Sequence, residues 1–353
     1  MGMVGENRSK ALDGLRGLAV LQVVIYHLYL LQPRTEEWYL MLRRLGSVID
    51  GLSLFFVLSG FLISRQLLAA QGSAGMIREF YGRRACRILP LYGVLLASYF
   101  LLRTADRHWQ WGFLYYWYSD FPLWNYLVFW QNVRMVHDLV LGAAWLAVTW
   151  SLAVEMQFYA LMPWMVHFIS TRWLTVLCLA SIAAAPCLRS VHVFDYLLTD
   201  RLDALATGVL LALALRHPAA SAWLARHRRQ LRYLVGAYLV AIVGLQASGA
   251  VSPVLRSQTL AALIFAVGIA LLTDGTPWRG VRATVERLAP IGLLSYFIYL
   301  FHMPVAYVFA VLAPGMAAAA LPVTAGLAGL SYRYIERPMI QWGHRQTAPN
   351  GPA

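Results

Sequence analysis

Charged residues are scarce in this chain, and lysine is almost missing. Only 13% of the 353 residues are charged, about half of the roughly 25% typical of soluble domains. The hydrophobic share is 60% and the mean hydropathy is +0.58. This deficit of charge excludes an ordinary soluble domain. Because many separate apolar runs approach the roughly 20 residues that a spanning helix needs, the sequence predicts an all-α, polytopic integral membrane bundle of about ten transmembrane helices.

Ten apolar runs are the candidate spans, and together they form one predicted transmembrane domain over residues 1–345. A short disordered cytosolic tail is expected at 346–353. The segment 104–145 is rich in Trp and Tyr, which favour the headgroup level of a membrane, so an interfacial loop with one or two short helices is expected there. The first run lacks a small-residue cleavage site and is expected to be a retained helix. The runs lie near 12–31, 51–70, 88–103, 146–167, 172–188, 202–216, 231–248, 257–273, 289–312 and 315–334.

Cysteine is also rare. The three cysteines, Cys86, Cys178 and Cys187, show no metal-binding spacing, which argues against a disulfide framework and predicts no metal. They are expected to be small buried hydrophobic residues.

The basic residues are nearly all arginine, since Lys10 is the only lysine among 29 basic residues. They lie mostly in short gaps between apolar runs, so the net charge of +13 indicates contact with membrane lipids or an anionic ligand and does not indicate a nucleic-acid partner. With the N-terminus in the cytosol, the cytosolic segments hold 17 Lys and Arg and the opposite loops hold nine. This bias predicts that both termini are cytosolic.

Two ionisable residues lie in the first apolar run. Arg16 and His27 are eleven residues apart, which places them on one helix face about 16 Å apart along the axis. Because charged groups in hydrocarbon are costly, such residues normally face a protein interior or a wet passage. The alternatives are a flanking Arg16 that reaches toward the headgroups and an interfacial His27 near a helix end.

Glu155 is a third candidate, because it places a carboxylate within the apolar run "TWSLAVEMQFYALMPW". The alternative is a structural ion pair between helices. Further polar residues are candidates for substrate contact or for structural roles such as helix-end acids, close helix packing and ion-paired helix termini. They are Asp13, Ser59, Arg201, Asp203, His302 and Glu336.

Six segments, in this order, resemble signatures of the acyltransferase-3 family, the membrane-bound bacterial O-acyltransferases of surface polysaccharides. The resemblance covers roughly residues 10–340. The segments are "LDGLRGLAVLQVVIYH", with an arginine, ten residues and a histidine; "LFFVLSGFL"; "RRACRILPLY"; "WSLAVEMQFY"; "SYFIYLFHMP"; and "YRYIERP".

The resemblance implies an acyl-CoA-dependent O-acyltransferase of the bacterial inner (cytoplasmic) membrane. The co-substrate would be a cytosolic acyl-CoA, most often acetyl-CoA, and the acceptor a hydroxyl of an envelope or secreted glycan. Arg84 and Arg87 would bind the donor phosphates, because guanidinium groups pair well with phosphate oxygens, and Arg16 would grip the donor in the passage. His27 would be the general base or the nucleophile, and Glu155 would orient His27 or pair with Arg16.

The same residues allow two other interpretations. In one, the enzyme acylates a lipid-linked sugar or a small secondary metabolite. In the other, Arg16, His27 and Glu155 form the ion path of a proton or solute transporter, although no inverted repeat is evident.

Overall fold

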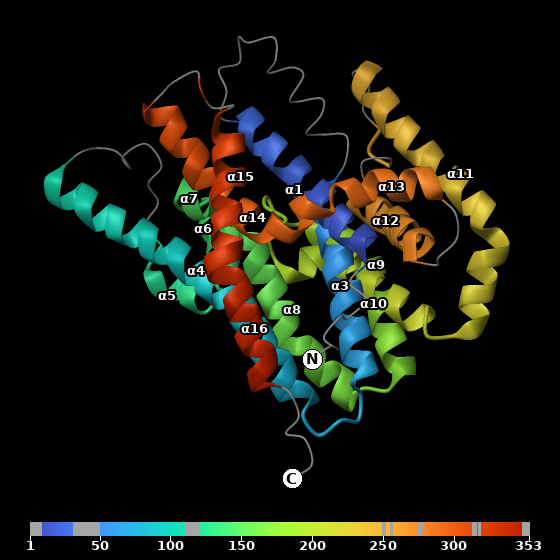
Figure 1. Ribbon diagram of the computed structural model, residues 1–353. Helices are drawn as coiled ribbons and strands as arrows, with labels where there is room; N and C mark the ends of the chain where they lie inside the picture. The colour runs from blue at the N-terminus through green and yellow to red at the C-terminus, as the bar shows by residue number, and fades with distance from the viewer. Residues whose placement is uncertain are drawn as a thin grey trace. The chain divides into compact units, whose positions relative to one another are not determined.

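The computed structural model describes residues 9–30, 50–110, 121–248, 252–254, 257–273, 278–312, 316 and 319–347, and these residues form helices and no strand (Figure 1). The predicted all-α class is therefore confirmed. The helices are α1 (Lys10–Leu30), α3 (Gly51–Ala69), α4 (Met76–Trp109), α5 (Leu123–Leu127), α6 (Gln131–Asp138), α7 (Ala144–Ala147), α8 (Thr149–Phe168), α9 (Thr171–Arg189), α10 (Leu198–Ala214), α11 (Pro218–Ser248), α12 (Gln258–Thr273), α13 (Arg279–Arg287), α14 (Ala289–Leu312), α15 (Ala320–Ser331), the π-helix η3 (Tyr332–Glu336) and α16 (Arg337–Gln346).

Each predicted apolar run falls in helical segments among the described residues. Six described helices are long and apolar enough to cross a membrane, namely α1, α3, α4, α9, α11 and α14. The count of about ten spans stays a prediction. The tail expected at 346–353 lies outside the described residues from 348 onward, and α16 ends at Gln346.

The aromatic segment contains more helix than expected. The helix α4 continues through Pro90 to Trp109, because neighbouring groups in a membrane protein can satisfy the backbone that proline disturbs. Three short helices, α5, α6 and α7, then follow, where one or two were predicted. Residues 111–120 of this segment lie outside the described residues.

The chain divides into two compact units, and three helices, α3, α10 and α14, each contribute to both. Unit 1 comprises Met1–Gln66, Thr171–Leu188 and Arg201–Tyr296. Unit 2 comprises Leu67–Ser170, Arg189–Asp200 and Phe297–Ala353. The predicted single domain over 1–345 stays a prediction.

In unit 1, α1 packs against α13 and α12, and α11 packs against α12 (Figure 1). A buried apolar cluster joins α11 and α12 through Leu224, Val235, Ile264, Ala270 and Leu271. This packing holds the helix that carries Arg16 and His27.

Glycine sets the distance between α3 and α10 in unit 1. A Cβ atom added at Gly60 would lie 2.2 Å from the Leu205 carbonyl oxygen, and one added at Gly208 would lie 2.2 Å from the Val57 carbonyl oxygen. Only glycine allows the two backbones to approach this closely. The close helix approach expected beside Ser59 is thus confirmed.

In unit 2, α4 packs side by side with α16 and α8, and α6 packs against α8 (Figure 1). Gly343 of α16 lies directly against Cys86 of α4, where an added Cβ would be 2.8 Å from the cysteine Cβ. Of the three cysteines, Cys178 is buried, Cys86 is half-buried and Cys187 is exposed. The expectation that all three are buried is wrong for Cys187, because that stretch of α9 is largely exposed.

Candidate functional site

The arginine of the first motif is part of an ion pair within α1. The Arg16 Nη1 atom lies 3.4 Å from Asp13 Oδ1, one helical turn away. Asp13 is only 4% exposed, and a buried carboxylate is costly unless a partner compensates its charge. Asp13 therefore helps to hold the half-buried Arg16 side chain on α1.

The histidine of the same motif is held by the turn that precedes it. The His27 Nδ1 atom lies 3.0 Å from the Val23 carbonyl oxygen, and the Tyr26 ring contacts the imidazole edge-on at 5.6 Å between centroids. Since a carbonyl oxygen only accepts hydrogen bonds, Nδ1 carries the proton, and neutral His27 then has its lone pair on Nε2. Because α1 is helical from Lys10 to Leu30, Arg16 and His27 share one face to within about 20°.

A second polar cluster of unit 1 joins α10 to α12. The Arg201 guanidinium donates to Gln258 Oε1 at 2.7 Å, and Thr259 donates its hydroxyl to Asp203 Oδ2. Arg201 and Asp203 are 5% and 1% exposed, so these bonds satisfy polar groups in the interior of the unit. Whether either residue also contacts substrate stays a prediction. Ser59 is likewise buried in α3.

The acidic motif residue of unit 2, Glu155 on α8, has a partner that the sequence reasoning missed. Tyr159, one turn further on, donates its hydroxyl to Glu155 Oε1, and both residues are buried. The spacing of four residues could have suggested the pair. The predicted pairing of Glu155 with Arg16 or His27 stays a prediction.

Arg84 of α4 joins this pair. Its guanidinium carbon lies 5.4 Å from the centroid of the Tyr159 ring and 5.8 Å from that of the Phe80 ring, within the range of cation–π attraction. The same guanidinium lies within electrostatic range of Glu155. Arg84, Tyr159 and Glu155 therefore form one charged cluster between α4 and α8, called the Arg84 cluster below.

Arg87 lies one turn beyond Arg84, and α4 is helical at both positions, so the two side chains share a face of the helix. Arg87 interacts electrostatically with Glu336, which closes the π-helix η3 and accepts a hydrogen bond from Ser331 at 3.2 Å. Glu336 follows the last apolar run and is 5% exposed. Burial raises the pKa of its carboxyl to about 7, and the Ser331 hydrogen bond and Arg87 oppose that rise.

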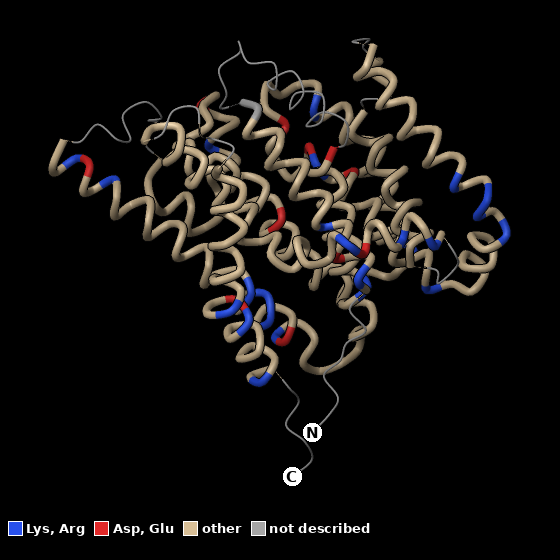
Figure 2. Tube along the Cα trace, turned by 45° about the horizontal axis from the view of Figure 1, so that its top comes forward, with Lys and Arg blue, Asp and Glu red and all other residues tan. Residues whose placement is uncertain are grey.

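The first part of α4 and the end of α16 form a basic surface, and Figure 2 shows Lys and Arg gathered in that region. The exposed Arg337 and Arg345 of α16 belong to it, and Glu79 pairs with Arg83 at 3.0 Å. A shallow depression on α16 is lined by Pro338, Met339, Gln341, Trp342 and Arg345. This end of unit 2 suits an anionic ligand.

His302 on α14 is 2% exposed. Its Nδ1 atom lies 2.7 Å from the Tyr299 carbonyl oxygen and 3.0 Å from that of Ile298. The side chain thus bonds its own helix within the core of unit 2, which is a structural arrangement.

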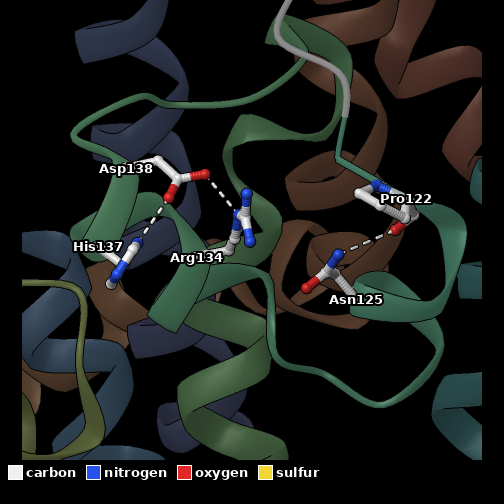
Figure 3. A network of polar contacts seen from close by, with 5 residues as sticks. All are labelled: Pro122, Asn125, Arg134, His137 and Asp138. Atoms are coloured by element: carbon white, nitrogen blue, oxygen red, sulfur yellow. Dashed lines mark hydrogen bonds and ion pairs between the residues drawn. The ribbon is translucent and has the colours of Figure 1, made fainter.

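Figure 3 shows a surface cluster at the end of α6, in the aromatic segment. The Asp138 carboxylate lies between Arg134 and His137, with His137 Nδ1 2.7 Å from Asp138 Oδ1 and Arg134 bonded to the other oxygen. The hydrogen bond from His137, with help from Arg134, lowers the pKa of the Asp138 carboxyl. In the same view, Asn125 donates to the Pro122 carbonyl oxygen at 3.3 Å. These are local contacts within α6 and at the start of α5, inside the segment 104–145 for which an interfacial loop was expected.

Within the part of the chain that the structure describes, no group of three or more His, Cys, Asp or Glu side chains could hold a metal ion. The candidate residues instead are arginines, a histidine and a carboxylate. That set suits an anionic substrate and proton transfer.

Comparison with known proteins decides the family. A family model described as an acyltransferase domain, that of the acyltransferase-3 family, matches residues 9–330. The chain belongs to the acyltransferase-3 family. As a family member with several apolar helices, it is a multi-pass membrane protein of the O-acyltransferase class.

Relatives of this acyltransferase-3 protein are named for the same chemistry. BcsY of Komagataeibacter xylinus, named as a candidate membrane-bound transacylase, is 27% identical over 96% of this chain and 85% of its own length. The O-acetyltransferase OatA of Staphylococcus aureus is 25% identical over 96% of this chain, which spans 58% of OatA. A candidate O-acetyltransferase of Staphylococcus aureus strain COL is 32% identical over 43% of this chain and 24% of its own length. No solved structure matches the chain.

Proposed function

We propose that this acyltransferase-3 protein transfers an acyl group from cytosolic acyl-CoA, with acetyl-CoA as the simplest donor, to a hydroxyl of an envelope or secreted glycan. The supporting observation is the match to an acyltransferase domain over residues 9–330. The names of its relatives, a transacylase and an O-acetyltransferase, agree with this chemistry. We place the protein in the bacterial inner membrane with both termini in the cytosol, because the arginine distribution favours that orientation.

The donor's phosphates are assigned to Arg84 and Arg87. Both lie on one face of α4, and guanidinium groups form paired hydrogen bonds with phosphate oxygens. The rings of Phe80 and Tyr159 fix the position of the Arg84 guanidinium, which reduces the conformational entropy that phosphate binding would cost. On α16, Trp342 lines a depression beside Arg345, and its indole ring suits the flat adenine of a CoA donor.

The proton transfer is assigned to His27. With Nδ1 bonded to the Val23 carbonyl, the Nε2 lone pair accepts the proton of the acceptor hydroxyl as its oxygen attacks the thioester carbonyl carbon. The new C–O bond forms, the C–S bond breaks, and the CoA thiolate takes up the proton from His27. If His27 is instead the nucleophile, an acyl-imidazole precedes the ester. Arg16, held by Asp13, is assigned to guiding the anionic donor.

The acceptor site is assigned to loops opposite the cytosolic side, including the aromatic segment 104–145. Described exposed tryptophans there are Trp109, Trp124 and Trp130. Their flat rings suit the apolar faces of sugars as well as the headgroup region. No metal enters this proposal.

The test uses the purified full-length protein in lipid nanodiscs with [1-14C]acetyl-CoA and a panel of oligosaccharides. We expect acceptor-dependent release of CoA and recovery of label as an oligosaccharide ester. Free [14C]acetate is the control donor and should give no ester. If neither CoA nor an ester forms, and the protein in liposomes carries protons at a rate that does not depend on acetyl-CoA, the protein is a transporter and not an acyltransferase.

A further inference from the structure

Unit 2 contains a loop whose two ends are fastened to each other. Residues 189–200 run from the last residue of α9 into the first turn of α10, and the Arg189 guanidinium donates to the Asp200 carbonyl oxygen at 2.6 Å. The Asp200 carboxylate is wholly buried and bonds His192 Nδ1 at 3.0 Å and the Leu197 amide at 3.1 Å. Compact loops closed in this way are often functional. We call this segment the tied loop.

The tied loop carries two aromatic rings, one of which packs against the start of α8. The Tyr196 ring stacks on the Trp150 ring at 4.2 Å between centroids and 19° between planes. It also stacks on the Phe194 ring at 5.2 Å and 6°. All three residues are half-buried, so each keeps some exposed surface. These residues, Trp150, Phe194 and Tyr196, form what we call the ring platform.

Buried amides set the position of the ring platform. Asn132 of α6, which is wholly buried, donates to the Tyr196 carbonyl oxygen at 3.1 Å. Asn132 and Gln157 of α8 exchange two hydrogen bonds, of 3.3 and 2.9 Å. Gln157 also donates to the Phe129 carbonyl oxygen at 2.9 Å. Trp150 and Gln157 are seven residues apart and share a face of α8, so the helix supports the rings and the amides together.

We infer that the ring platform binds a sugar ring of the acyl acceptor. A pyranose presents a face of C–H bonds that packs on a flat aromatic surface, while its hydroxyls need polar partners at the rim. The tied loop carries two such polar side chains, the half-buried Asp195, which lies between Phe194 and Tyr196 in the sequence, and His192, whose Nδ1 atom bonds Asp200. Because the loop is already tied, little further ordering is needed when the sugar binds.

Anchoring to lipid headgroups is the competing role for these rings. Aromatic anchors act as separate amphipathic rings at the membrane surface, whereas these three are nearly parallel and half-buried. The most exposed apolar side chains of the tied loop are Val191 and Val193, at 74% and 76%. A stack of near-parallel rings suits the flat C–H face of a sugar at an uncovered ring face better than it suits separate insertion of each ring among the headgroups.

This inference rests on the proposed acyl transfer to a glycan. Trp150→Ala is compared with Trp150→Phe and with Trp164→Ala, whose ring stacks on Phe168 in the same helix and is 47% exposed. Saturation-transfer NMR on the full chain in nanodiscs measures binding of cellotetraose, chitotetraose and maltotetraose. The transfer assay measures KM for the sugar and for acetyl-CoA separately.

We expect at least one tetrasaccharide to bind, and Trp150→Ala to weaken its binding about tenfold. Trp150→Phe should restore most of that loss, while Trp164→Ala and the KM for acetyl-CoA should be unchanged. If no tetrasaccharide binds, or if Trp150→Ala weakens binding no more than Trp164→Ala does, the platform assignment is wrong. If the wild-type protein still transfers acetyl from acetyl-CoA in that case, the proposed function stands without the platform. If the wild-type protein shows no such transfer, the proposed function itself is refuted.

Discussion

Replacing Tyr159 by phenylalanine tests the Arg84 cluster. The change removes the hydroxyl that donates to Glu155 but keeps the ring beneath the Arg84 guanidinium. A hydrogen bond to a charged group contributes about 1.5–3 kcal/mol. Tyr159 and Glu155 are only 4% and 8% exposed, so water cannot readily replace the lost donor. We expect Tyr159→Phe to lower the free energy of unfolding by about 2 kcal/mol.

The assay is reversible unfolding in mixed detergent micelles, followed by circular dichroism, with a double-mutant cycle. Glu155→Gln removes the carboxylate, and the double variant Glu155→Gln with Tyr159→Phe completes the cycle. Because the two side chains are in direct contact, we expect a coupling energy of about 1 kcal/mol or more. Tyr334→Phe is the matched control, since Tyr334 is 65% exposed and its change should be nearly neutral.

Additive effects would refute this reasoning. A stabilising contact makes the double variant lose less than the sum of the two single losses. If it loses the full sum, within about 0.5 kcal/mol, then Tyr159 and Glu155 do not stabilise each other. The Arg84 cluster would then have no energetic basis. A similar loss in Tyr334→Phe would show that the detergent, and not the buried hydrogen bond, causes the effect.

Replacing Arg84 and Arg87 together by alanine should raise the KM for acetyl-CoA about tenfold or more with little change in kcat at saturating donor; an unchanged KM would remove both from donor binding. Burial raises the pKa of Glu336 in the folded protein to about 7, from an ordinary value of 4.5. Between these two pH values the folded state keeps a proton that the unfolded state has lost. The free energy of unfolding should therefore fall as the pH rises from 4.5 to 7, by up to about 3 kcal/mol. Glu336→Gln should flatten that decline in unfolding measured from pH 4.5 to 8, and an unaltered slope would contradict the raised pKa. Gly208→Ala should destabilise the protein by about 1–3 kcal/mol, because the new Cβ would lie 2.2 Å from the Val57 carbonyl oxygen. The control Gly236→Ala meets open space on α11 and should stabilise the protein by about 0.5–1 kcal/mol. Equal effects of the two variants in thermal unfolding would contradict the close approach of α3 and α10.

Apolar run length predicted the helices well, because hydropathy over 15–25 residues depends on composition and not on distant contacts. The same local logic suggested close helix packing at Ser59, and the adjacent Gly60 indeed meets the Leu205 backbone. Helix ends were less predictable. The helix α4 passes Pro90 and continues to Trp109, because tertiary surroundings outweigh the local preference of proline to end a helix.

The contacts that the sequence did not predict join residues from different helices or from distant parts of the chain. The contact of Tyr159 with Glu155 could have been predicted, because the two residues are one helical turn apart. The contact of its ring with Arg84 could not, because Arg84 lies on another helix. The tied loop needs Asp200 to be buried and Asn132 to meet Tyr196, 64 residues away. Such contacts arise only when the helices pack, so the ring platform had no sequence signature.

The role of His27 is the point on which the proposed function depends most. The direct test is single-turnover transfer of [14C]acetyl from acetyl-CoA in nanodiscs, comparing wild type with His27→Gln and with His167→Gln, a control at an exposed histidine of α8. We predict that His27→Gln inserts normally and binds acetyl-CoA yet forms no ester, while His167→Gln matches wild type. Ester formation by His27→Gln at the wild-type rate would contradict any role for this imidazole as base or nucleophile.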